Sequence, residues 1–221
     1  MKYFLLGLVL IFGLLGCSKK ISELEKQLIQ QGLVSIQDIN PQIEVSLAYS
    51  QPDNVLGHDI YGDLQKAYMQ VDVAKKLSHA QDILNEKKPG YKLIIYDSVR
   101  PLSVQKKMWD LVKGTDKQIY VANPKFGSIH NYGSAIDLSI LNDKGLLLDM
   151  GTPFDFFGKL AQPRYEQHFL KEGRLQKHHI KNRQLLREVM KAAGFKGINV
   201  EWWHFNSVSR AEAKRRYSII Q

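Results

Sequence analysis

The chain has 221 residues and a net charge of +9; 44% of its residues are hydrophobic and 24% are charged. This size predicts one globular domain with a single core, and the absence of a recurring interval excludes repeat architectures. Lysine and arginine are dispersed in short clusters rather than in a basic stripe with interleaved aromatic residues, so we expect no nucleic-acid partner. The basic charge fits better with an exported protein close to anionic lipid and cell-wall polymer.

The N-terminus has the pattern of a secretory signal. Lys2 precedes an apolar run over residues 3–15, which is shorter than the roughly 20 residues that a transmembrane helix needs. Residues 14–17 (Leu-Leu-Gly-Cys) resemble the bacterial lipoprotein box, in which the cysteine is acylated. We therefore expect a lipoprotein signal peptide over residues 1–16 and a membrane anchor at Cys17, the only cysteine of the chain. An uncleaved anchor or a chance cysteine is the alternative.

These features predict an exported lipoprotein whose folded part lies on the periplasmic side of a membrane. Ser18, in place of an aspartate after the cysteine, favours the outer membrane where the cell has one. We expect a lipidated tether with a short helix over residues 17–35 and the folded domain over residues 36–221. Without a second cysteine no internal disulfide can form, so the core must be stable unaided. Nothing in the sequence indicates an obligate protein partner.

The first half of the domain predicts two strands and two helices. Alternating apolar residues indicate a strand over residues 43–48, and a loop rich in Asp, Asn and Gly follows over residues 53–62. Apolar residues at helical spacing predict a helix over residues 64–85. A strand over residues 91–96 and a helix over residues 101–113, with proline in its first turn, come next.

The second half predicts more strands than helices. A turn over residues 142–145 separates two apolar segments and predicts a hairpin. Asn182 and Gly194 are suited to cap and to end a helix. The elements are strands over residues 135–141 and 146–150, a helix over residues 183–193 and a strand over residues 198–205. We predict an α+β fold with a mostly antiparallel sheet, flanking helices and a metal site on the sheet.

Three residues have the chemistry of a zinc site. His130 lies in a glycine-flanked loop, Asp137 interrupts an apolar strand, and His204 lies in the last strand. Two histidines and one carboxylate form a common catalytic zinc set, which leaves a fourth position for water. A bound cation would remove the cost of burying Asp137. The alternative is an aspartate whose charge is satisfied by backbone donors or by an arginine.

Two further residues are candidates for catalysis. Glu201 precedes His204 by three positions and could accept the proton of a water activated by zinc. In an extended strand Glu201 and His204 would point to opposite faces, so a twist, bulge or turn near Trp203 must bring them together. Arg100 follows a strand and could stabilise the oxygen that becomes negative when water attacks an amide. Its alternative is an ordinary surface salt bridge.

Other nucleophiles and histidines fit less well. A serine hydrolase is disfavoured because no Gly-x-Ser-x-Gly segment occurs, and a lipidated Cys17 excludes a thiol mechanism. The remaining histidines are interpreted as surface residues: His58, His79 and His168 as isolated ones, and His178 and His179 as an adjacent pair in a lysine-rich segment.

Residues 128–137 (Ser-Ile-His-Asn-Tyr-Gly-Ser-Ala-Ile-Asp) and 201–204 (Glu-Trp-Trp-His) together resemble the D-alanyl-D-alanine dipeptidases, zinc enzymes related to the vancomycin-resistance dipeptidase. The resemblance extends over residues 43–205. Residues 97–101 resemble the arginine segment of that family, and residues 150–156 resemble the stretch after its zinc-binding hairpin. The lipoprotein signal departs from many relatives, which we expect to be cytoplasmic.

The resemblance implies one Zn²⁺ per chain, held by His130, Asp137 and His204, with Glu201 as base and Arg100 stabilising the transition state. It adds three substrate contacts. Asp155 would pair with the free ammonium group of the dipeptide, although a turn-capping role is the alternative. Ser128 and Tyr49 would lie around the substrate carboxylate.

The expected activity is hydrolysis of D-Ala-D-Ala to two D-alanine molecules. Two alternatives remain open from the sequence. One is a D,D-carboxypeptidase or endopeptidase that acts on peptidoglycan stem peptides and has a more open cleft. The other is a non-catalytic wall-binding lipoprotein, against which the complete set of metal ligands and base argues.

Overall fold

The computed structural model describes residues 21–221; the expected signal peptide and Cys17 lie outside the described residues. No helix within the described range is both long and apolar enough to cross a membrane. The helices are α1 (Glu23–Gln30), α2 (Ile36–Ile39), α3 (Val71–Lys87), α4 (Leu102–Val112), α5 (Glu166–Lys171), α6 (Lys177–Ala192) and α7 (Arg210–Arg216). The strands are β1 (Val34–Ser35), β2 (Glu44–Val45), β3 (Tyr68–Met69), β4 (Lys92–Asp97), β5 (Ala135–Leu141), β6 (Lys196–Gly197) and β7 (His204–Asn206). Short 3₁₀ helices are η1 (Ala48–Ser50), η2 (Asp116–Tyr120), η3 (Ile129–Tyr132), η4 (Lys159–Ala161) and η5 (Pro163–Tyr165).

The main sheet has five strands in the order β2-β4-β5-β7-β6, and β1 pairs with β3 in a separate two-stranded sheet. β2 and β4 are parallel, whereas β4–β5, β5–β7 and β6–β7 are antiparallel. A parallel pair requires a crossover connection of about a dozen residues or more, and α3 lies in that connection here. The α+β class is confirmed, but the sheet is mixed, so the expected mostly antiparallel sheet was wrong.

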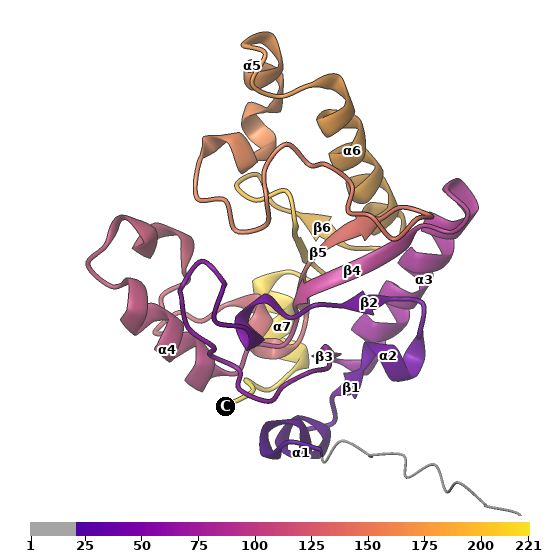
Figure 1. The fold of residues 1–221 in the computed structure, drawn as a ribbon. Helices are drawn as coiled ribbons and strands as arrows, with labels where there is room; N and C mark the ends of the chain where they lie inside the picture. Colours follow the sequence, from indigo (N-terminus) through magenta and orange to yellow (C-terminus); the bar gives the residue numbers. More distant parts are fainter. Residues whose placement is uncertain (1–20) are drawn as a thin grey trace, which may run out of the picture.

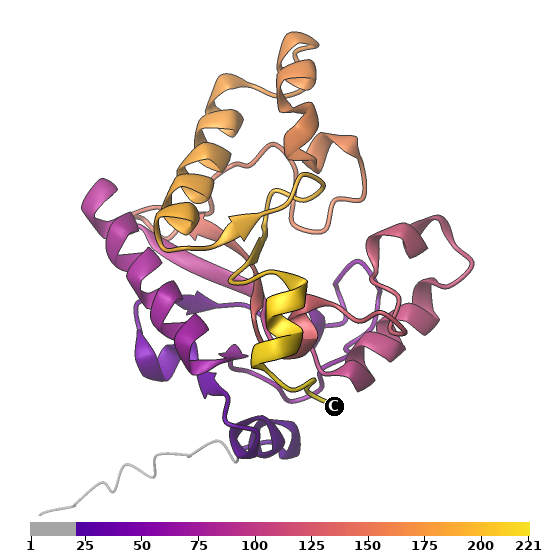
Figure 2. The same cartoon turned by 180° about the vertical axis from the view of Figure 1, so that it is seen from behind.

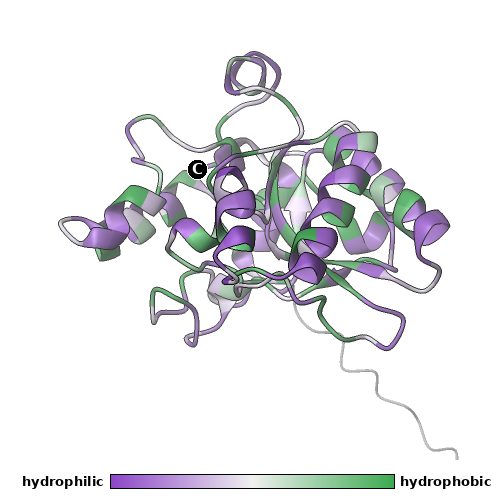
Figure 3. Cartoon of the chain, turned by 90° about the horizontal axis from the view of Figure 1, so that it is seen from above, coloured by the Kyte–Doolittle hydropathy of each residue, from purple (hydrophilic) through white to green (hydrophobic). Residues whose placement is uncertain are grey.

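Helices on two sides enclose the sheet. α3 and α6 pack against each other at one side of the molecule, and α4 lies at the other (Figures 1 and 2). In Figure 3 the helices carry both apolar and polar residues, as amphipathic helices that cover a core do. The apolar face expected for the first long helix is fully buried: Val73, Ala74, Leu77, Ala80 and Leu84.

The long elements around the site have almost the predicted bounds. β5 matches its prediction, and β4 and α4 differ from theirs by one residue at each end. The turn between the two expected hairpin strands also forms, because Asn142 N–H donates to the carbonyl of Leu146. Its second strand is reduced to one bridge, between Leu147 and Leu141.

Other bounds were wrong. α3 begins at Val71 because the residues before it pair as β3. α6 begins at Lys177, where Gln176 and His179 cap it, so Asn182 lies inside the helix. The strand expected over residues 198–205 is β7 alone, and the residues before His204 form a loop.

The segment before the expected domain boundary contains a short helix, as expected, and packs against the core. Ser22 and Glu25 form a capping box at the start of α1. Leu28 in α1 and Leu33 after it are buried in the main core. The packed part of the chain therefore includes part of the segment for which the sequence predicted a tether with a short helix.

Candidate metal and substrate site

Three residues of the site lie side by side on three neighbouring strands. Asp137 on β5 is the register partner of Asp97 on β4 and of His204 on β7. A β-bulge between Ile95 and Asp97 shifts the β4 register at this point. Bulges re-aim side chains next to functional sites, and here the bulge places Asp97 opposite Asp137.

His130 reaches the same place from η3. Ser128 caps this short helix, because its hydroxyl accepts from the His130 backbone N–H at 3.3 Å. Gly133 ends it with a φ of 61°, a left-handed conformation that glycine adopts without strain. An added Cβ at Gly133 would also lie 2.9 Å from the end of the Leu33 side chain, which would have to shift. The turn therefore places the His130 imidazole next to Asp137 of β5.

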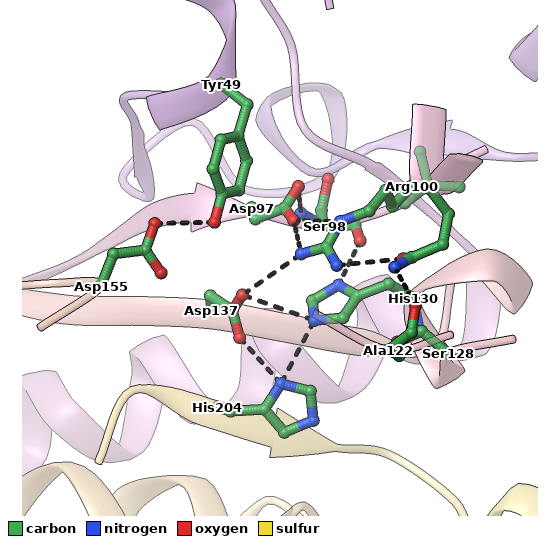
Figure 4. A network of polar contacts seen from close by, with 12 residues as sticks. Tyr49, Asp97, Ser98, Arg100, Ala122, Ser128, His130, Asp137, Asp155 and His204 are labelled. Atoms are coloured by element: carbon green, nitrogen blue, oxygen red, sulfur yellow. Dashed lines mark hydrogen bonds and ion pairs between the residues drawn. The ribbon is translucent and has the colours of Figure 1, made fainter. Parts of the chain in front are cut away.

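The structure brings the three predicted metal ligands together (Figure 4). Nδ1 of His204 lies 2.9 Å from Oδ1 of Asp137, and Nε2 of His130 lies 3.4 Å from Oδ2 of Asp137. The two imidazole nitrogens are 3.2 Å apart. One ligand atom from each residue falls within 4.8 Å of the others, a spacing that one metal ion can bridge.

The surrounding hydrogen bonds fit a metal as well. The carbonyl oxygen of Ser98 can only accept, so Nδ1 of His130 donates to it at 2.6 Å and the lone pair of Nε2 faces Asp137. Oδ1 of Asn206 lies 3.0 Å from Nε2 of His204 and directs Nδ1 of that ring to the site in the same way. Metal-binding histidines have such partners for their second nitrogen.

The charges around Asp137 favour a cation at this place. Burial alone would raise the pKa of Asp137, but His130 and His204 hold it well below its usual range. Burial alone would lower the pKa of His204, but its hydrogen bond to Asp137 raises that pKa to about 9. Asp137 thus favours a positive charge beside it even in the absence of a metal. A bound Zn²⁺ would supply that positive charge.

Arg100 is held by an acidic partner that the sequence analysis missed. Its Nε donates to Oδ2 of Asp97 at 3.0 Å, Nη2 donates to the same oxygen, and Nη1 donates to Oε1 of Gln105 at 3.2 Å. Asp97 is fully buried, and the Arg100 side chain is only 9% exposed. Tyr61 donates to the other oxygen of Asp97 at 2.7 Å. The surface salt bridge considered for Arg100 is therefore excluded.

Arg100 also faces the metal ligands. Its Nη2 lies 3.9 Å from Oδ2 of Asp137. Burial would lower the pKa of the guanidinium, but the charge of Asp97 outweighs it and raises that pKa further. Arg100 is therefore a fixed positive charge at the cavity wall, and its orientation is determined by Asp97.

Glu201 lies in the loop before β7 and lines the site cavity. The departure from extended geometry that the sequence required near Trp203 is therefore confirmed. Trp202 and Trp203 are each 3% exposed, and Nε1 of Trp202 donates to Oγ1 of Thr152 at 2.9 Å, which anchors the loop. Burial raises the pKa of Glu201 above its ordinary value, toward the range in which a carboxylate is an effective base.

Asp155 and Tyr49 form a hydrogen-bonded pair in the wall of the same cavity. The Tyr49 hydroxyl donates to Oδ2 of Asp155 at 2.7 Å. Its expected contact with the substrate carboxylate stays a prediction. Burial raises the pKa of Asp155 to about 8. Asp155 is also the only described residue other than glycine with positive φ, at 57°. Aspartate adopts this left-handed conformation more readily than most residues. Backbone strain of this kind is common at binding sites.

These residues surround one cavity of about 170 Å³. All eight site residues that the sequence predicted within the described range line it: Tyr49, Arg100, Ser128, His130, Asp137, Asp155, Glu201 and His204. The rest of the lining is largely apolar: Leu56, Met108, Tyr120, Val121, Ala122, Phe157 and Trp203. Small-molecule sites usually measure about 300–1,000 Å³, so this cavity suits a very small ligand.

A second acid–histidine group lies on the surface. Oδ2 of Asp149 is 3.0 Å from Nε2 of His179 and 3.5 Å from Nε2 of His178. The backbone N–H of Gln176 donates to Nδ1 of His179, so the neutral ring carries its proton on Nε2. A nitrogen that bears a proton cannot bind a metal, so this arrangement fits an ion pair and a helix cap better than a metal site.

Comparison with known proteins agrees with the site. The family model described as D-ala-D-ala dipeptidase (Peptidase_M15) matches residues 29–221. The chain is 35% identical to the D-alanyl-D-alanine dipeptidase of Escherichia coli K12 over 173 residues, which is 78% of this chain and 83% of the relative. It is 27% identical over 168 residues to the D-alanyl-D-alanine dipeptidase of Synechocystis sp., covering 62% of this chain and 68% of the relative.

A solved LD-carboxypeptidase, LdcB, aligns with 83% of this chain and 71% of its own, at 21% identity and a TM-score of 0.46. The family match covers far more than half of the chain, and the E. coli relative is similar over most of its length. The chain belongs to the D-Ala-D-Ala dipeptidase family and is a zinc metallopeptidase.

Proposed function

We propose that this protein hydrolyses the free dipeptide D-Ala-D-Ala to two D-alanine molecules. The observation that carries the proposal is the convergence of the three metal ligands, Glu201, Arg100 and Asp155 on one cavity of about 170 Å³. A cavity of that size with a buried carboxylate in its wall favours a short substrate that carries its own ammonium group. Both curated relatives are D-alanyl-D-alanine dipeptidases, which supports the same substrate.

In this proposal His130, Asp137 and His204 hold Zn²⁺. The ion supplies Lewis-acid activation of water at the scissile amide. Glu201 accepts the proton of the attacking water and donates it to the departing amine nitrogen, so one residue is base and then acid. The raised pKa of Glu201 supports both steps. Arg100, oriented by Asp97, stabilises the negative charge that develops on the amide oxygen.

The two ends of the dipeptide would meet different groups. Asp155 pairs with the ammonium group, and Tyr49 keeps Oδ2 of Asp155 in place through its 2.7 Å hydrogen bond. Burial raises the pKa of Tyr49, so its hydroxyl remains a donor. Ser128, which lines the cavity next to His130, is a candidate for the substrate carboxylate.

The test compares two substrates with the zinc-loaded full-length protein: D-Ala-D-Ala and N-acetyl-D-Ala-D-Ala. We expect D-alanine release from the free dipeptide and little from the blocked one, because acetylation removes the charge that Asp155 would bind. Asp155→Asn is the matched variant, and it should reduce this preference. Preferential cleavage of the acetylated form would identify a D,D-carboxypeptidase instead, and zinc-loaded protein that cleaves neither would favour a wall-binding lipoprotein.

We further propose that the protein is exported and anchored through a lipid on Cys17. The sequence of residues 14–17 and the single cysteine support this. Cells that express the chain should incorporate a palmitate analogue into it, and Cys17→Ser should abolish incorporation and release the protein from the membrane fraction. Labelling that persists in Cys17→Ser would contradict the assignment.

A further inference from the structure

A groove with a larger volume lies next to the site cavity. It has a volume of about 550 Å³, within the range of small-ligand pockets. Its wall includes Val55 and the aromatic residues Tyr96, Phe154 and Phe156. Asp155 and Phe157 line both this groove and the site cavity. These two residues therefore form the boundary between a small reaction cavity and a roomier groove.

Phe157 is held in this boundary by an aromatic partner from another part of the chain. Its ring stacks on Tyr120, with centroids 4.5 Å apart and an interplanar angle of 15°. Tyr120 is the last residue of η2 and also lines the site cavity. Stacked aromatic rings attract each other beyond the burial of their area, so Tyr120 favours this position of the Phe157 ring.

A third segment completes the wall. Nζ of Lys117 in η2 donates to the carbonyl of Val55 at 3.1 Å, and the adjacent Leu56 lines the site cavity. Figure 1 shows the loop before β3 beside the segment that follows α4. Loops from three parts of the chain thus meet at the Tyr120–Phe157 stack, although none of them carries a metal ligand.

We propose that the Tyr120–Phe157 stack is the partition that limits the substrate to two residues. The inference rests on the proposed function, in which the substrate ammonium lies at Asp155. A peptide with one more residue on its amino side would have to continue past Asp155 into the groove. The ring of Phe157, two residues after Asp155 in the chain and stacked on Tyr120, occupies that path. Asp155 selects the amine, while the stack excludes the longer chain by its volume.

The experiment uses the zinc-loaded full-length protein in detergent and two substrates with free amines, D-Ala-D-Ala and Gly-D-Ala-D-Ala. The measured quantity is the ratio of kcat/KM for the dipeptide to kcat/KM for the tripeptide, from release of the C-terminal D-alanine. Phe157→Ala and Tyr120→Ala should lower this ratio by about tenfold or more, the scale on which changes in a pocket wall alter discrimination. Tyr120→Phe, which retains the stacking ring, should keep the wild-type ratio.

Ile119→Ala is the matched control. Ile119 precedes Tyr120 in the same 3₁₀ helix but is 81% exposed and does not line the cavity. Its ratio should equal that of the wild type. Circular dichroism of each variant verifies that the fold is retained. An unchanged ratio in folded Phe157→Ala and Tyr120→Ala, or an equal change in Ile119→Ala, would overturn the inference.

A binding measurement separates this inference from the proposed function. Calorimetry in the Glu201→Gln background, which we expect to turn over neither peptide, gives the two affinities directly. Adding Phe157→Ala should improve tripeptide affinity relative to dipeptide affinity by a similar factor. If the wild type cleaves the dipeptide but this relative affinity does not change, the partition is wrong and the proposed function stands. If the wild type cleaves neither peptide, the proposed function fails, and an unchanged relative affinity would overturn the partition as well.

Discussion

Asp137 and His204 face each other as register partners on β5 and β7, with Nδ1 of the imidazole 2.9 Å from Oδ1 of the carboxylate. Asp97, which holds Arg100, is the next register partner of Asp137 on β4. A shift of one residue in a strand turns every side chain to the other face of the sheet. The pairing of β4, β5 and β7 therefore fixes Asp97, Asp137 and His204 relative to one another, and Asp97 in turn fixes the guanidinium of Arg100.

Asn206 orients His204, so its removal should weaken zinc binding. Asn206→Ala loses the 3.0 Å contact with Nε2 of His204, and the ring can then rotate away from Asp137. Loss of such a partner typically lowers metal affinity by about 10–100-fold. Competition with a chromogenic zinc chelator measures the affinity. Asn182→Ala is the control, since the Asn182 side chain donates to the carbonyl of Asp149 at the surface, and equal affinities for both variants would contradict the role of Asn206.

Glu201 should be needed for turnover and not for the metal. Glu201→Ala removes the proposed proton acceptor and leaves His130, Asp137 and His204 unchanged. We expect zinc content equal to that of the wild type, measured by mass spectrometry of the metal, with nearly complete loss of D-alanine release. Glu201→Gln, which keeps the shape of the side chain, should behave in the same way. Loss of zinc in either variant would make Glu201 a ligand.

Much of the fold could be predicted because its signals are local. β5 and the buried face of α3 follow from the spacing of apolar residues. The parallel pairing of β2 with β4 could not be predicted, because it depends on how residues about 50 positions apart meet, as in the pair Glu44 and Ile94. Gln176 as the cap of α6 was missed because a glutamine is not a usual cap residue.

At the site, too, some residues could be predicted from the sequence and others could not. The metal ligands and the base could be proposed from their chemistry, because a metal site explains an aspartate in an apolar strand together with two histidines. These residues are His130, Asp137, His204 and Glu201. Their supporting residues could not, because Asn206 and Gln105 are ordinary polar residues until their partners are known. Asp97 did carry a signal: an acidic residue at the end of an apolar strand, three positions before Arg100. Tyr120 and Phe157 carried none, since their contact joins two distant loops.

The raised pKa of Asp155 predicts a pH-dependent stability in the metal-free protein. Its folded-state pKa is about 8, whereas an unfolded aspartate titrates near ~4. Between these values the folded state binds a proton that the unfolded state does not, so this residue destabilises the fold progressively as the pH rises. Asp155→Asn does not titrate, and asparagine tolerates the positive φ.

The stability of Asp155→Asn relative to the wild type should therefore increase from pH 5 to pH 8 and level off above that. Urea unfolding of both metal-free proteins at several pH values measures it. Tyr49→Phe in each background is the control for the hydrogen bond, since it removes only the hydroxyl that donates to Asp155. A difference that does not vary with pH would mean that Asp155 titrates at an ordinary pKa.

Arg100 is proposed to act in the reaction, but its loss should also destabilise the protein, and two variants separate these effects. Arg100→Leu leaves Asp97 fully buried without its cation, which typically costs about 3–5 kcal/mol in a buried pair. It should also lower kcat by about a hundredfold or more, the effect of losing a group that stabilises an oxyanion. Adding Asp97→Asn removes the unpaired charge, so the double variant should regain much of the lost stability in urea unfolding. Its kcat should remain as low as that of Arg100→Leu, because the guanidinium is still absent. Recovery of kcat together with stability would show that Arg100 maintains the structure of the site and takes no part in the chemical step.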